Sequence, residues 1–292
     1  RVDRIAQVLV QDLGLAPGNR VLLRGGNSIG MALAWLAVVK AGLVAVATMP
    51  LLRAKELGDI IAKAQPTVAL CDARLLDELQ AAQARHPVLH TIVPFNLMDA
   101  PGSLAVRAAA KDGNFRACDT AADDIAMMAF TSGTTGKPKA AVHSHRDILA
   151  ACECWPRHVL RPEPHDIVMG SPPLAFTFGL GGMLIFPMWA GASVYYPDAP
   201  YTPQTMVQLM REVGCTTCYT APTFYRQMAP FAREAGIPTL TKCVSAGEGL
   251  PDATRQLWKD ATGLEMIDGI GATEMFHIFI SSAGSEVRRG AI

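Results

Sequence analysis

The densest group of hydrogen-bond donors in the sequence lies in one nine-residue stretch that directly follows an apolar segment. It reads Thr131-Ser132-Gly133-Thr134-Thr135-Gly136-Lys137-Pro138-Lys139. Gly133 and Gly136 allow several backbone N–H groups to turn inward as a nest for an anion, and Lys137 can neutralise phosphate charge. A Walker A loop has four residues between its glycines and Ser or Thr after the lysine, so this is a different type of loop. The stretch predicts a phosphate-binding loop, with a plain polar turn as the alternative.

A second candidate for chemistry is the serine of Gly26-Asn27-Ser28-Ile29-Gly30, between an expected strand and an expected helix. The pattern Gly-x-Ser-x-Gly is that of a nucleophile elbow, in which a strained turn exposes the serine hydroxyl. On this interpretation the chain is an α/β-hydrolase that uses Ser28. Only 25 residues precede the motif, too few for the upstream strands and oxyanion loop of that fold. The hydrolase therefore stays an alternative.

Three pairs of residues have side chains of metal-binding types: Cys215 and Cys218, Cys152 and Cys154, and His143 and His145. On a strand an odd separation sends two side chains to opposite faces, and on a helix residues two apart also diverge. The two histidines could share one face of a strand, but no third ligand lies nearby in the sequence. Structural zinc needs four ligands at suitable spacing, so we expect structural roles for all three pairs.

The overall composition is that of a globular chain without a charge excess. The 292 residues are 50% hydrophobic and 18% charged, which excludes a disordered chain. Because 26 basic residues balance 26 acidic ones, there is no basic excess for nucleic-acid binding. Seven cysteines without regular spacing indicate buried thiols in a reducing compartment, which predicts a cytoplasmic protein. Residues 31–50 are almost all apolar, but Lys40 at their centre favours a buried helix and a strand over a membrane span.

The elements expected from hydrophobic periodicity alternate between strands and helices, which predicts parallel sheets covered on both faces. Strands are expected at 21–23, 44–47, 68–70, 125–130, 167–169, 194–196, 215–219, 243–244 and 265–267. Helices are expected at 2–13, around Trp35, in a segment that ends near Gln65, at 203–213 and at 252–261. A polar break at 121–124 suggests two subdomains, 1–122 and 123–292. The fold class is therefore α/β, with two parallel-rich sheets in a layered sandwich and helices on both faces.

Three motifs in the same chain order resemble those of the AMP-forming adenylating enzymes, which include acyl-CoA synthetases, firefly luciferase and the adenylation domains of peptide synthetases. The stretch from Thr131 to Lys139 is similar to the family's phosphate loop. Residues 245–251 resemble its adenine-contacting turn, and residues 268–274 resemble its later Tyr-Gly-x-Thr-Glu motif. The resemblance covers essentially the whole chain and implies the layered fold of the family's N-terminal domain.

This sequence resembles one branch of the family more than the other branches. Ile270 stands where most relatives have a tyrosine that stacks on adenine, so an apolar contact would replace the stacking. Benzoate- and 2-aminobenzoate-CoA ligases have a similar replacement at this position. The sequences of residues 275–280 and 172–182 are also similar to those enzymes. The similarity implies a flat pocket for a small aromatic acid. The acyl pocket would be formed by Phe178, Gly179, His277 and Ile278.

The family's reaction implies roles for the remaining motif residues. A carboxylate attacks the α-phosphate of ATP, pyrophosphate leaves, and coenzyme A then displaces AMP to give a thioester. Bringing an anion to a polyanion needs preorganised donors and a cation rather than a protein nucleophile. Thr273 would donate to the α-phosphate, Glu274 would ligate Mg²⁺, and Lys137 would act with them in catalysis. The phosphate site would contain Thr131, Ser132, Gly133, Thr134, Thr135, Gly136 and Lys137, and the adenine site Ser245, Ala246, Gly247, Glu248, Asp268, Gly269, Ile270 and Gly271.

The resemblance also implies parts that lie outside this sequence, which ends at Ile292 and, because it does not begin with Met, is expected to be trimmed at its start. In the family a smaller C-terminal domain carries a lysine that contacts the reacting carboxylate, and an aspartate before the hinge binds the ribose. We therefore expect a fragment that binds nucleotide but adenylates weakly alone. A non-catalytic nucleotide-binding relative is the other alternative, although the intact Lys137 and Glu274 favour an enzyme. The expected partners are an aromatic carboxylate, ATP and coenzyme A, with no nucleic acid and no membrane.

Overall fold

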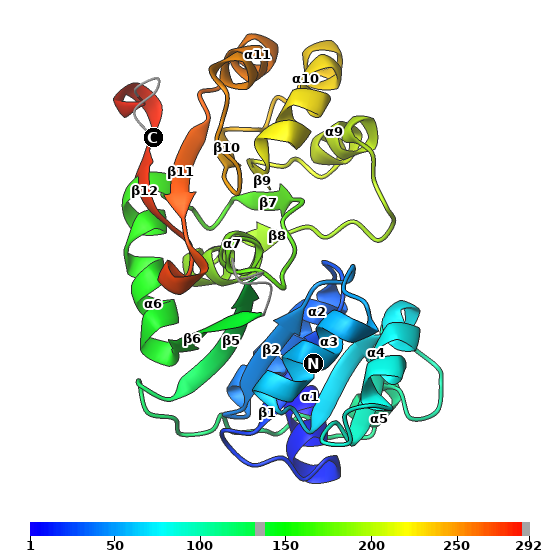
Figure 1. Cartoon of the computed structure of the whole chain (residues 1–292). Helices are drawn as coiled ribbons and strands as arrows, with labels where there is room; N and C mark the ends of the chain where they lie inside the picture. Colours follow the sequence, from blue (N-terminus) through cyan, green and yellow to red (C-terminus); the bar gives the residue numbers. More distant parts are fainter. Residues whose placement is uncertain (132–137, 288–292) are drawn as a thin grey trace. The chain divides into compact units, whose positions relative to one another are not determined.

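The structure, a computed structural model, describes residues 1–131 and 138–287. The chain divides into two compact units, Arg1–Asp147 and Ile148–Ile292, each built on its own six-stranded sheet (Figure 1). Helices cover both sheets, and most neighbouring strands are parallel. The predicted fold class, α/β with two parallel-rich sheets, is therefore confirmed.

The first sheet has the strand order β4-β3-β1-β2-β5-β6, in which β6 runs antiparallel to β5. Its strands are β1 (Arg20–Arg24), β2 (Val44–Thr48), β3 (Val68–Asp72), β4 (Thr91–Phe95), β5 (Ile125–Thr131) and β6 (Lys139–Ser144). The helices of this unit are α1 (Val2–Gln7), α2 (Ile29–Lys40), α3 (Ala54–Ala64), α4 (Leu76–Gln83), α5 (Leu104–Ala109) and the start of α6 (His145–Glu153). Helix α2 packs against β1 and β2, and α3 packs against α4.

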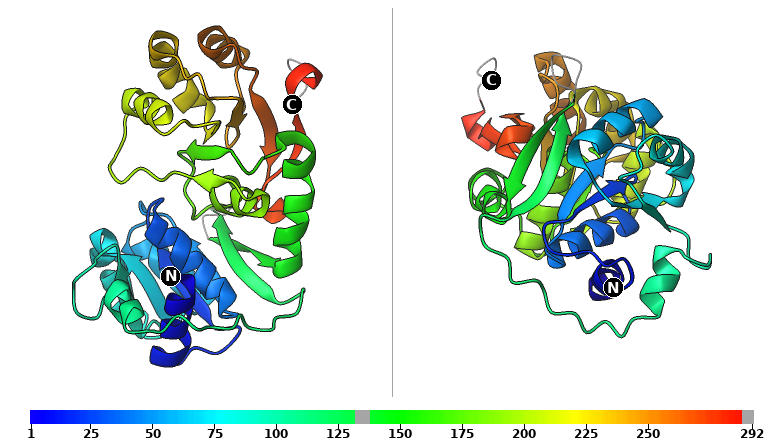
Figure 2. Two further views of the ribbon diagram at one scale, coloured as in Figure 1. Left: turned by 180° about the vertical axis from the view of Figure 1, so that it is seen from behind. Right: turned by 60° about the horizontal axis from the view of Figure 1, so that its bottom comes forward.

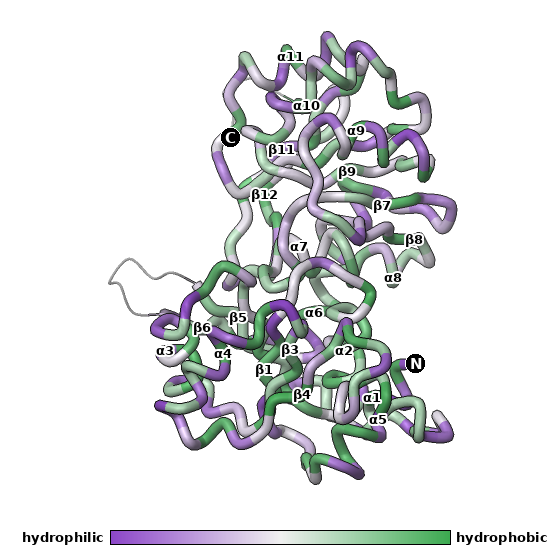
Figure 3. The backbone as a smooth tube through the Cα atoms, turned by 90° about the vertical axis from the view of Figure 1, so that its right-hand side faces the viewer, coloured by the Kyte–Doolittle hydropathy of each residue, from purple (hydrophilic) through white to green (hydrophobic). Residues whose placement is uncertain are grey.

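The strands in the middle of this sheet are buried on both faces. Every residue of β2 and β3 is buried, as expected for parallel strands between two layers of helices. On one face Leu22, Val46 and Ala69 form a core with Leu57 and Ile61 of α3. Hydrophobic colours accordingly run through the backbone of this sheet in Figure 3. Such strands are continuous apolar runs, which is why the sequence revealed them.

The second sheet has the order β12-β11-β10-β9-β7-β8, in which β12 runs antiparallel to β11. Its strands are β7 (Ile167–Gly170), β8 (Ser193–Val194), β9 (Thr217–Thr220), β10 (Lys242–Ser245), β11 (Ile267–Gly271) and β12 (Ile278–Ser282). The helices of this unit are α7 (Thr177–Leu180), α8 (Phe186–Ala190), α9 (Pro203–Glu212), α10 (Pro222–Ala235) and α11 (Asp252–Thr262). Helix α10 packs between α9 and α11.

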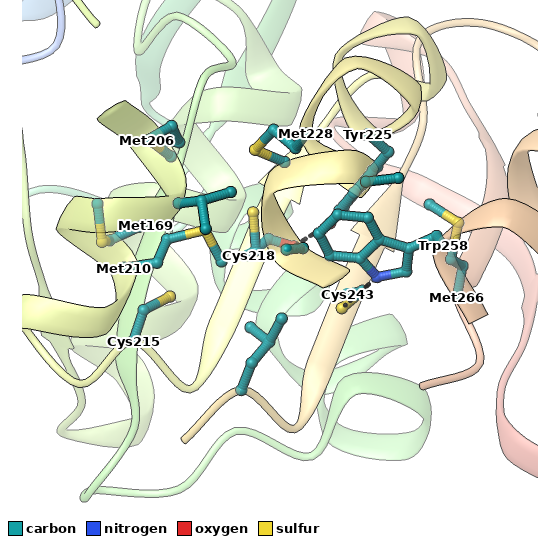
Figure 4. Close-up of a cluster of buried hydrophobic side chains, with 14 residues drawn as sticks. Met169, Met206, Met210, Cys215, Cys218, Tyr225, Met228, Cys243, Trp258 and Met266 are labelled. Carbon is teal, nitrogen blue, oxygen red and sulfur yellow. Dashed lines mark hydrogen bonds between the residues drawn. The ribbon is translucent and has the colours of Figure 1, made fainter. Parts of the chain in front are cut away.

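The core between this sheet and helices α9 to α11 is rich in sulfur (Figure 4). Two large rings enter it with their polar atoms satisfied. The indole N–H of Trp258 donates to Sγ of Cys243 at 3.2 Å, and the hydroxyl of Tyr225 donates to the carbonyl of Cys218 at 2.7 Å. Buried tryptophan and tyrosine usually find such partners. The two rings therefore tie α10 and α11 to neighbouring strands.

The boundary between the units differs from the predicted one at 122/123. Strand β5 pairs with β2 in parallel, and β6 pairs with β5, so both strands belong to the first sheet. The antiparallel pair of β5 and β6 can be followed in both views of Figure 2. The units divide instead after Asp147. The polar segment at 121–124 is a turn that leads into β5, in which the Asp124 carboxylate accepts a hydrogen bond from the Ala121 N–H at 2.8 Å.

Several predicted elements keep their place with changed limits. The helix at 203 is capped as predicted, since Thr202 Oγ1 accepts from the Thr205 N–H at 3.2 Å. The predicted helix 2–13 passes from α1 into a π-helical turn at Val8–Asp12. Strand β8 ends at Val194, before Tyr196, whose hydroxyl donates to the Met183 carbonyl.

The apolar stretch at residues 31–50 forms most of α2 followed by β2, as predicted. Lys40, at the end of α2, forms an ion pair with Asp3. Within the described part of the chain, no helix has the length and hydrophobicity that crossing a bilayer requires.

Ser28 caps helix α2. Its Oγ accepts hydrogen bonds from the Met31 N–H at 3.1 Å and from Nδ2 of Asn96 at 3.3 Å. Its backbone is extended, with φ −162° and ψ 160°, whereas a nucleophile elbow requires a strained turn. The α/β-hydrolase alternative is therefore wrong in its central residue, because the serine in the motif stabilises a helix start.

Replacing this cap should weaken the fold measurably. We expect Ser28→Ala to lower the free energy of unfolding by about 1 kcal/mol, because one N–H of the first turn loses its acceptor. Ser28→Asp keeps an acceptor and serves as the control, with most of the stability retained. Urea denaturation followed by circular dichroism measures both. An equal loss in the two variants would contradict the capping role.

Candidate active site

A cavity of about 400 Å³ lies within the second unit, at the carboxyl ends of four neighbouring strands. Ser171 follows β7, Ala221 follows β9, Ala246 follows β10 and Ala272 follows β11, and all four residues line the cavity. The four strands are parallel and adjacent in the sheet. Open α/β sheets bind ligands in the crevice outside the carboxyl ends of their strands. The position of the cavity therefore makes it the candidate active site.

The aromatic wall of the cavity depends on a close backbone approach at Gly179. A Cβ atom at this position would lie 2.1 Å from the carbonyl oxygen of Pro173 and 2.6 Å from that of Pro172. No side chain fits there, so the short helix α7 packs directly on the segment before it. This packing places Phe178 and Phe176 in the cavity wall.

His277 lies in the same wall, surrounded by aromatic rings. The centroid of its ring is 4.7 Å from that of Phe186, 5.0 Å from Trp155 and 5.2 Å from Phe178. Gly181 makes room for it, because a Cβ atom at that position would lie 2.7 Å from Cδ2 of His277. The imidazole is thus held in one orientation by packing on several sides.

Burial and one hydrogen bond define the state of this imidazole. His277 is 3% exposed, and its Nε2 lies 3.2 Å from the carbonyl oxygen of Phe178. Burial lowers the pKa of His277 to about 3, which the bond to Phe178 only partly opposes. The ring is therefore neutral at physiological pH. Its Nδ1 is buried and has no hydrogen-bond partner among the described residues.

The predicted catalytic residues Thr273 and Glu274 lie in the tight turn between β11 and β12. Residues Thr273–Met275 form one 3₁₀ turn, and the N–H of Phe276 donates to the carbonyl of Thr273 at 3.1 Å. Thr273 lines the cavity, whereas Glu274 is exposed and does not. Because the turn is short, it also brings His277 back to the same edge of the sheet.

The residues predicted for adenine separate into two groups. Those that line the cavity are Ala246, Gly247, Glu248 and Gly271, and those that do not are Ser245, Asp268, Gly269 and Ile270. The buried Asp268 lies 3.4 Å from the guanidinium of Arg255. Burial raises the pKa of Asp268, and Arg255 opposes this shift. The side chain of Asp268 is therefore held by helix α11. The adenine contacts proposed for the eight residues of both groups stay predictions.

The residues predicted for the acyl group and the phosphates are distributed as follows. Phe178, His277 and Ile278 line the cavity, and Gly179 lies behind its wall. Thr131 ends β5 in the first unit and pairs with Lys139 of β6. Ser132, Gly133, Thr134, Thr135, Gly136 and Lys137 lie outside the described residues.

The sequence analysis missed part of the lining. The additional residues are Ser171, Pro172, Pro173, Phe176, Thr177, Ala221 and Ala272. A signal for two of them was present, because Ser171 and Ala221 each lie two residues beyond the end of a predicted strand. In a parallel sheet such positions meet at one edge, so they could have been assigned to the site.

The pairs considered as metal ligands do not assemble a metal site in the described residues, although Cys215 and Cys218 share one core and do not diverge to opposite faces of a strand as predicted, because β9 begins only at Thr217. Cys218 lies in the apolar core, where burial raises the pKa of its thiol to about 12, and Cys215 is buried in the same core. His143 belongs to β6 and His145 begins α6, so the two do not share a strand. In the ranges 1–131 and 138–287, no group of three or more His, Cys, Asp or Glu side chains is placed to hold a metal ion.

The low pKa of His277 should make the folded state sensitive to acid. Between pH 6.5 and 3 the unfolded chain binds a proton at this residue and the folded chain does not, so stability falls as the pH falls. From pH 7 to pH 5 we expect the native protein to lose about 2 kcal/mol more than His277→Gln loses. Denaturant titrations of both proteins at each pH measure the difference. Identical pH dependence would show that His277 titrates normally.

Known proteins with similar sequences support the assignment of the cavity as the candidate active site. Residues 1–291 match the family profile described as AMP-binding enzyme. The chain is 32% identical to a benzoate–CoA ligase of Thauera aromatica over 99% of the chain and 55% of that protein. It is 30% identical to an anthranilate–CoA ligase of Pseudomonas aeruginosa over 94% of the chain and 52% of that protein. The chain thus spans about half the length of these curated relatives.

Among solved structures, the fold matches that of the anthranilate CoA ligase AuaEII in complex with anthranoyl-AMP. The TM-score is 0.91 at 31% sequence identity, over 99% of this chain and 57% of that one. The motif order, the position of the cavity and the match over residues 1–291 all lead to the same conclusion. The chain belongs to the family of AMP-binding enzymes.

Proposed function

We propose that this chain takes part in the ATP-dependent activation of a small aromatic carboxylic acid. The acid would be converted to an acyl-adenylate with release of pyrophosphate, and then to its coenzyme A thioester with release of AMP. The similar proteins named benzoate–CoA ligase and anthranilate–CoA ligase support this reaction class. The observation that carries the proposal is the aromatic wall of the cavity, where Phe178 and His277 stand beside the turn that holds Thr273.

The size and lining of the cavity favour a ring over a long chain. Its volume of about 400 Å³ includes the space that the nucleotide would share. The acyl side is bounded by Phe178, His277 and Ile278, and the His277 ring is packed tightly against Phe186 behind it. An extended acyl chain would have to displace this aromatic cluster, and close-packed interiors resist such displacement. A flat aromatic acid requires no such change.

The adenylation step places specific demands on the polar residues. The attacking carboxylate and the triphosphate are both anionic, so catalysis depends on fixed donors rather than on a nucleophilic side chain. Thr273, in the cavity wall, would donate to the α-phosphate. The loop residues Thr131 to Lys137 would hold the β- and γ-phosphates, with Lys137 as their cation. Glu248 and its neighbours Ala246 and Gly247 would contact the adenine.

Magnesium enters with the nucleotide, and the residues present are compatible with it. Mg²⁺ is commonly bound by one or two carboxylates, the substrate phosphates and several waters, so it needs no cluster of protein ligands. Glu274 offers an exposed carboxylate directly after Thr273 in the same turn. Bound there, the metal would neutralise charge on the phosphates. We propose Glu274 as its protein ligand.

The ligand class can be tested by calorimetric titration with two non-hydrolysable adenylate analogues in which a sulfamate replaces the phosphate. We expect the 2-aminobenzoyl analogue to bind at least about tenfold more tightly than the hexadecanoyl analogue, because the long chain does not fit the aromatic wall. Equal affinities would leave nucleotide binding intact and contradict the aromatic pocket. Absence of binding by both would contradict the proposed function.

The role of Glu274 can be tested separately. We expect Glu274→Gln to weaken the magnesium-dependent binding of ATP by about tenfold or more, because the substitution removes the charge that holds the metal. Binding of the sulfamate analogue without magnesium should change less than about twofold. Glu286→Gln, at an exposed position outside the cavity, is the matched control. Equal behaviour of both variants would exclude Glu274 as the ligand.

A further inference from the structure

A second cavity, of about 360 Å³, lies within the first unit. It is bounded by α1, α2, α5 and the segment that follows β4, and α1 packs against both other helices (Figure 3). Its volume falls within the range of ligand-binding pockets. It also lies outside the carboxyl end of a parallel strand, where open α/β sheets bind ligands. The first unit thus contains a candidate ligand site that the proposed reaction does not use.

The walls of this cavity are mostly apolar. Its lining includes side chains from three helices and the end of β4, namely Ile5, Leu33, Phe95, Leu104 and Ala108. Ile29 and Met98 also line it, although each is more than half exposed. Exposed apolar side chains that gather beside a cavity are typical of binding sites. Because burial of apolar surface is favourable, such walls accept the hydrocarbon part of a ligand.

The polar residue Asn96, directly after β4, belongs to the lining but has no donor to spare. Its Nδ2 donates to a carboxylate oxygen of the buried Asp72 at 2.7 Å and to Ser28 Oγ at 3.3 Å. A Cβ atom at Gly30 would lie 2.2 Å from its Oδ1, so the first turn of α2 packs directly on this side chain. Asn96 therefore closes part of the wall and serves the protein's own structure.

The charged side chains in the described lining are two arginines, Arg1 and Arg4, which lie one helical turn apart. Arg4 packs along a turn of the chain, because a Cβ atom at Gly113 would lie 3.3 Å from its Cγ and 3.4 Å from its Nε. This turn is tied to α1, since the N–H of Gly113 donates to Oε1 of Gln7 at 2.9 Å. The Arg4 side chain is thus placed between a fixed turn and the cavity.

The guanidinium of Arg4 has no bonded counter-ion within residues 1–131 and 138–287. Asp112 lies close enough for its charge to interact with that of Arg4. However, the Asp112 Oδ1 accepts hydrogen bonds from Nε2 of Gln7 at 2.6 Å and from the Asn114 N–H at 2.9 Å, and these bonds do most to lower its pKa. The donors of Arg4 are therefore available to an anion.

We propose that the cavity of the first unit binds a monocarboxylic acid with an apolar body. Its carboxylate pairs with Arg4, because guanidinium and carboxylate groups match in a planar, two-bonded geometry. Its hydrocarbon part lies against the apolar walls. An exposed ion pair alone contributes little free energy, so both parts of the ligand are needed. This site is separate from the cavity of the second unit and does not depend on the proposed function.

The test compares three small probes in an NMR titration of the chain with labelled isoleucine methyl groups. Octanoate has both the charge and the apolar body, 1-octanol has the same chain without the charge, and acetate has the charge without the chain. We expect octanoate to shift the Ile5 and Ile29 resonances saturably, with an affinity at least about fivefold above that of either other probe. Ile278 lines the cavity of the second unit and reports binding there separately.

Three variants assign the effect to the arginine and to the cavity. Arg4→Gln should weaken octanoate binding about fivefold and leave 1-octanol unchanged, because only the charged partner is lost. Arg20→Gln, at the exposed start of β1 and outside the lining, is the matched control and should bind octanoate like the native chain. Ala108→Leu occupies part of the cavity and should weaken both octanoate and 1-octanol.

The outcomes separate the two parts of the proposal. Equal affinities for octanoate and 1-octanol, or equal octanoate binding by the native chain and Arg4→Gln, would overturn the pairing with the arginine. Shifts confined to Ile278, or no saturable shift at Ile5 and Ile29, would overturn the site itself. The proposed function is tested by the adenylate analogues and stands or falls independently of these results.

Discussion

The second unit depends on one constraint: its parallel strands are covered on both faces, so polar chemistry is confined to their ends. All four residues of β9 are buried, and three of the four residues of β7 and of β10 are buried as well. A ligand cannot reach the middle of such a sheet. Because β7, β9, β10 and β11 run in one direction, the residues after them meet at one edge and form the cavity. The antiparallel strand β12 then starts at this edge, with Ile278 opposite Gly271, and so returns His277 to the cavity.

Buried polar groups lie at both ends of this sheet. At the amino ends of β7, β9 and β10, the buried Asp166 accepts hydrogen bonds from Lys242 Nζ and from Thr216 Oγ1, both at 2.7 Å. Asp166 and Lys242 thus form an ion pair at that end, and this pair has a structural role. At the carboxyl ends, Ser245 Oγ and His277 Nδ1 are buried without partners among the described residues. Thr217 Oγ1, in the first residue of β9, is also buried without a described partner, so unsatisfied groups occur at both ends of the sheet. The cavity is what marks the carboxyl edge as the ligand side.

Glycines decide how the aromatic wall is built. At Gly179 and Gly181 the available space is taken by the Pro173 carbonyl and by the His277 ring, so any larger side chain would force the wall apart. The imidazole is fixed by this packing and by its bond to the Phe178 carbonyl. The sulfur-rich core behind the sheet plays a different part. Its thiols are buried, with raised pKa values such as about 12 for Cys218, and act as apolar packing groups.

Much of the fold could be read from local sequence, and much of the site could not. The sequence by itself determined the alternation of apolar strands with helices, the Thr202 cap and the order of the three motifs, because each of these is encoded within a few consecutive residues. It did not indicate strands β4 and β12 or helix α10, and it placed the boundary between the units before β5 and not after Asp147. Only the tertiary structure decided that Ser28 is a cap, that Asp268 is held by Arg255, and that His277 meets the Phe178 carbonyl across 99 residues of chain. The physical reason is that pairing and burial depend on which distant segments pack together, and no short stretch of sequence carries that information.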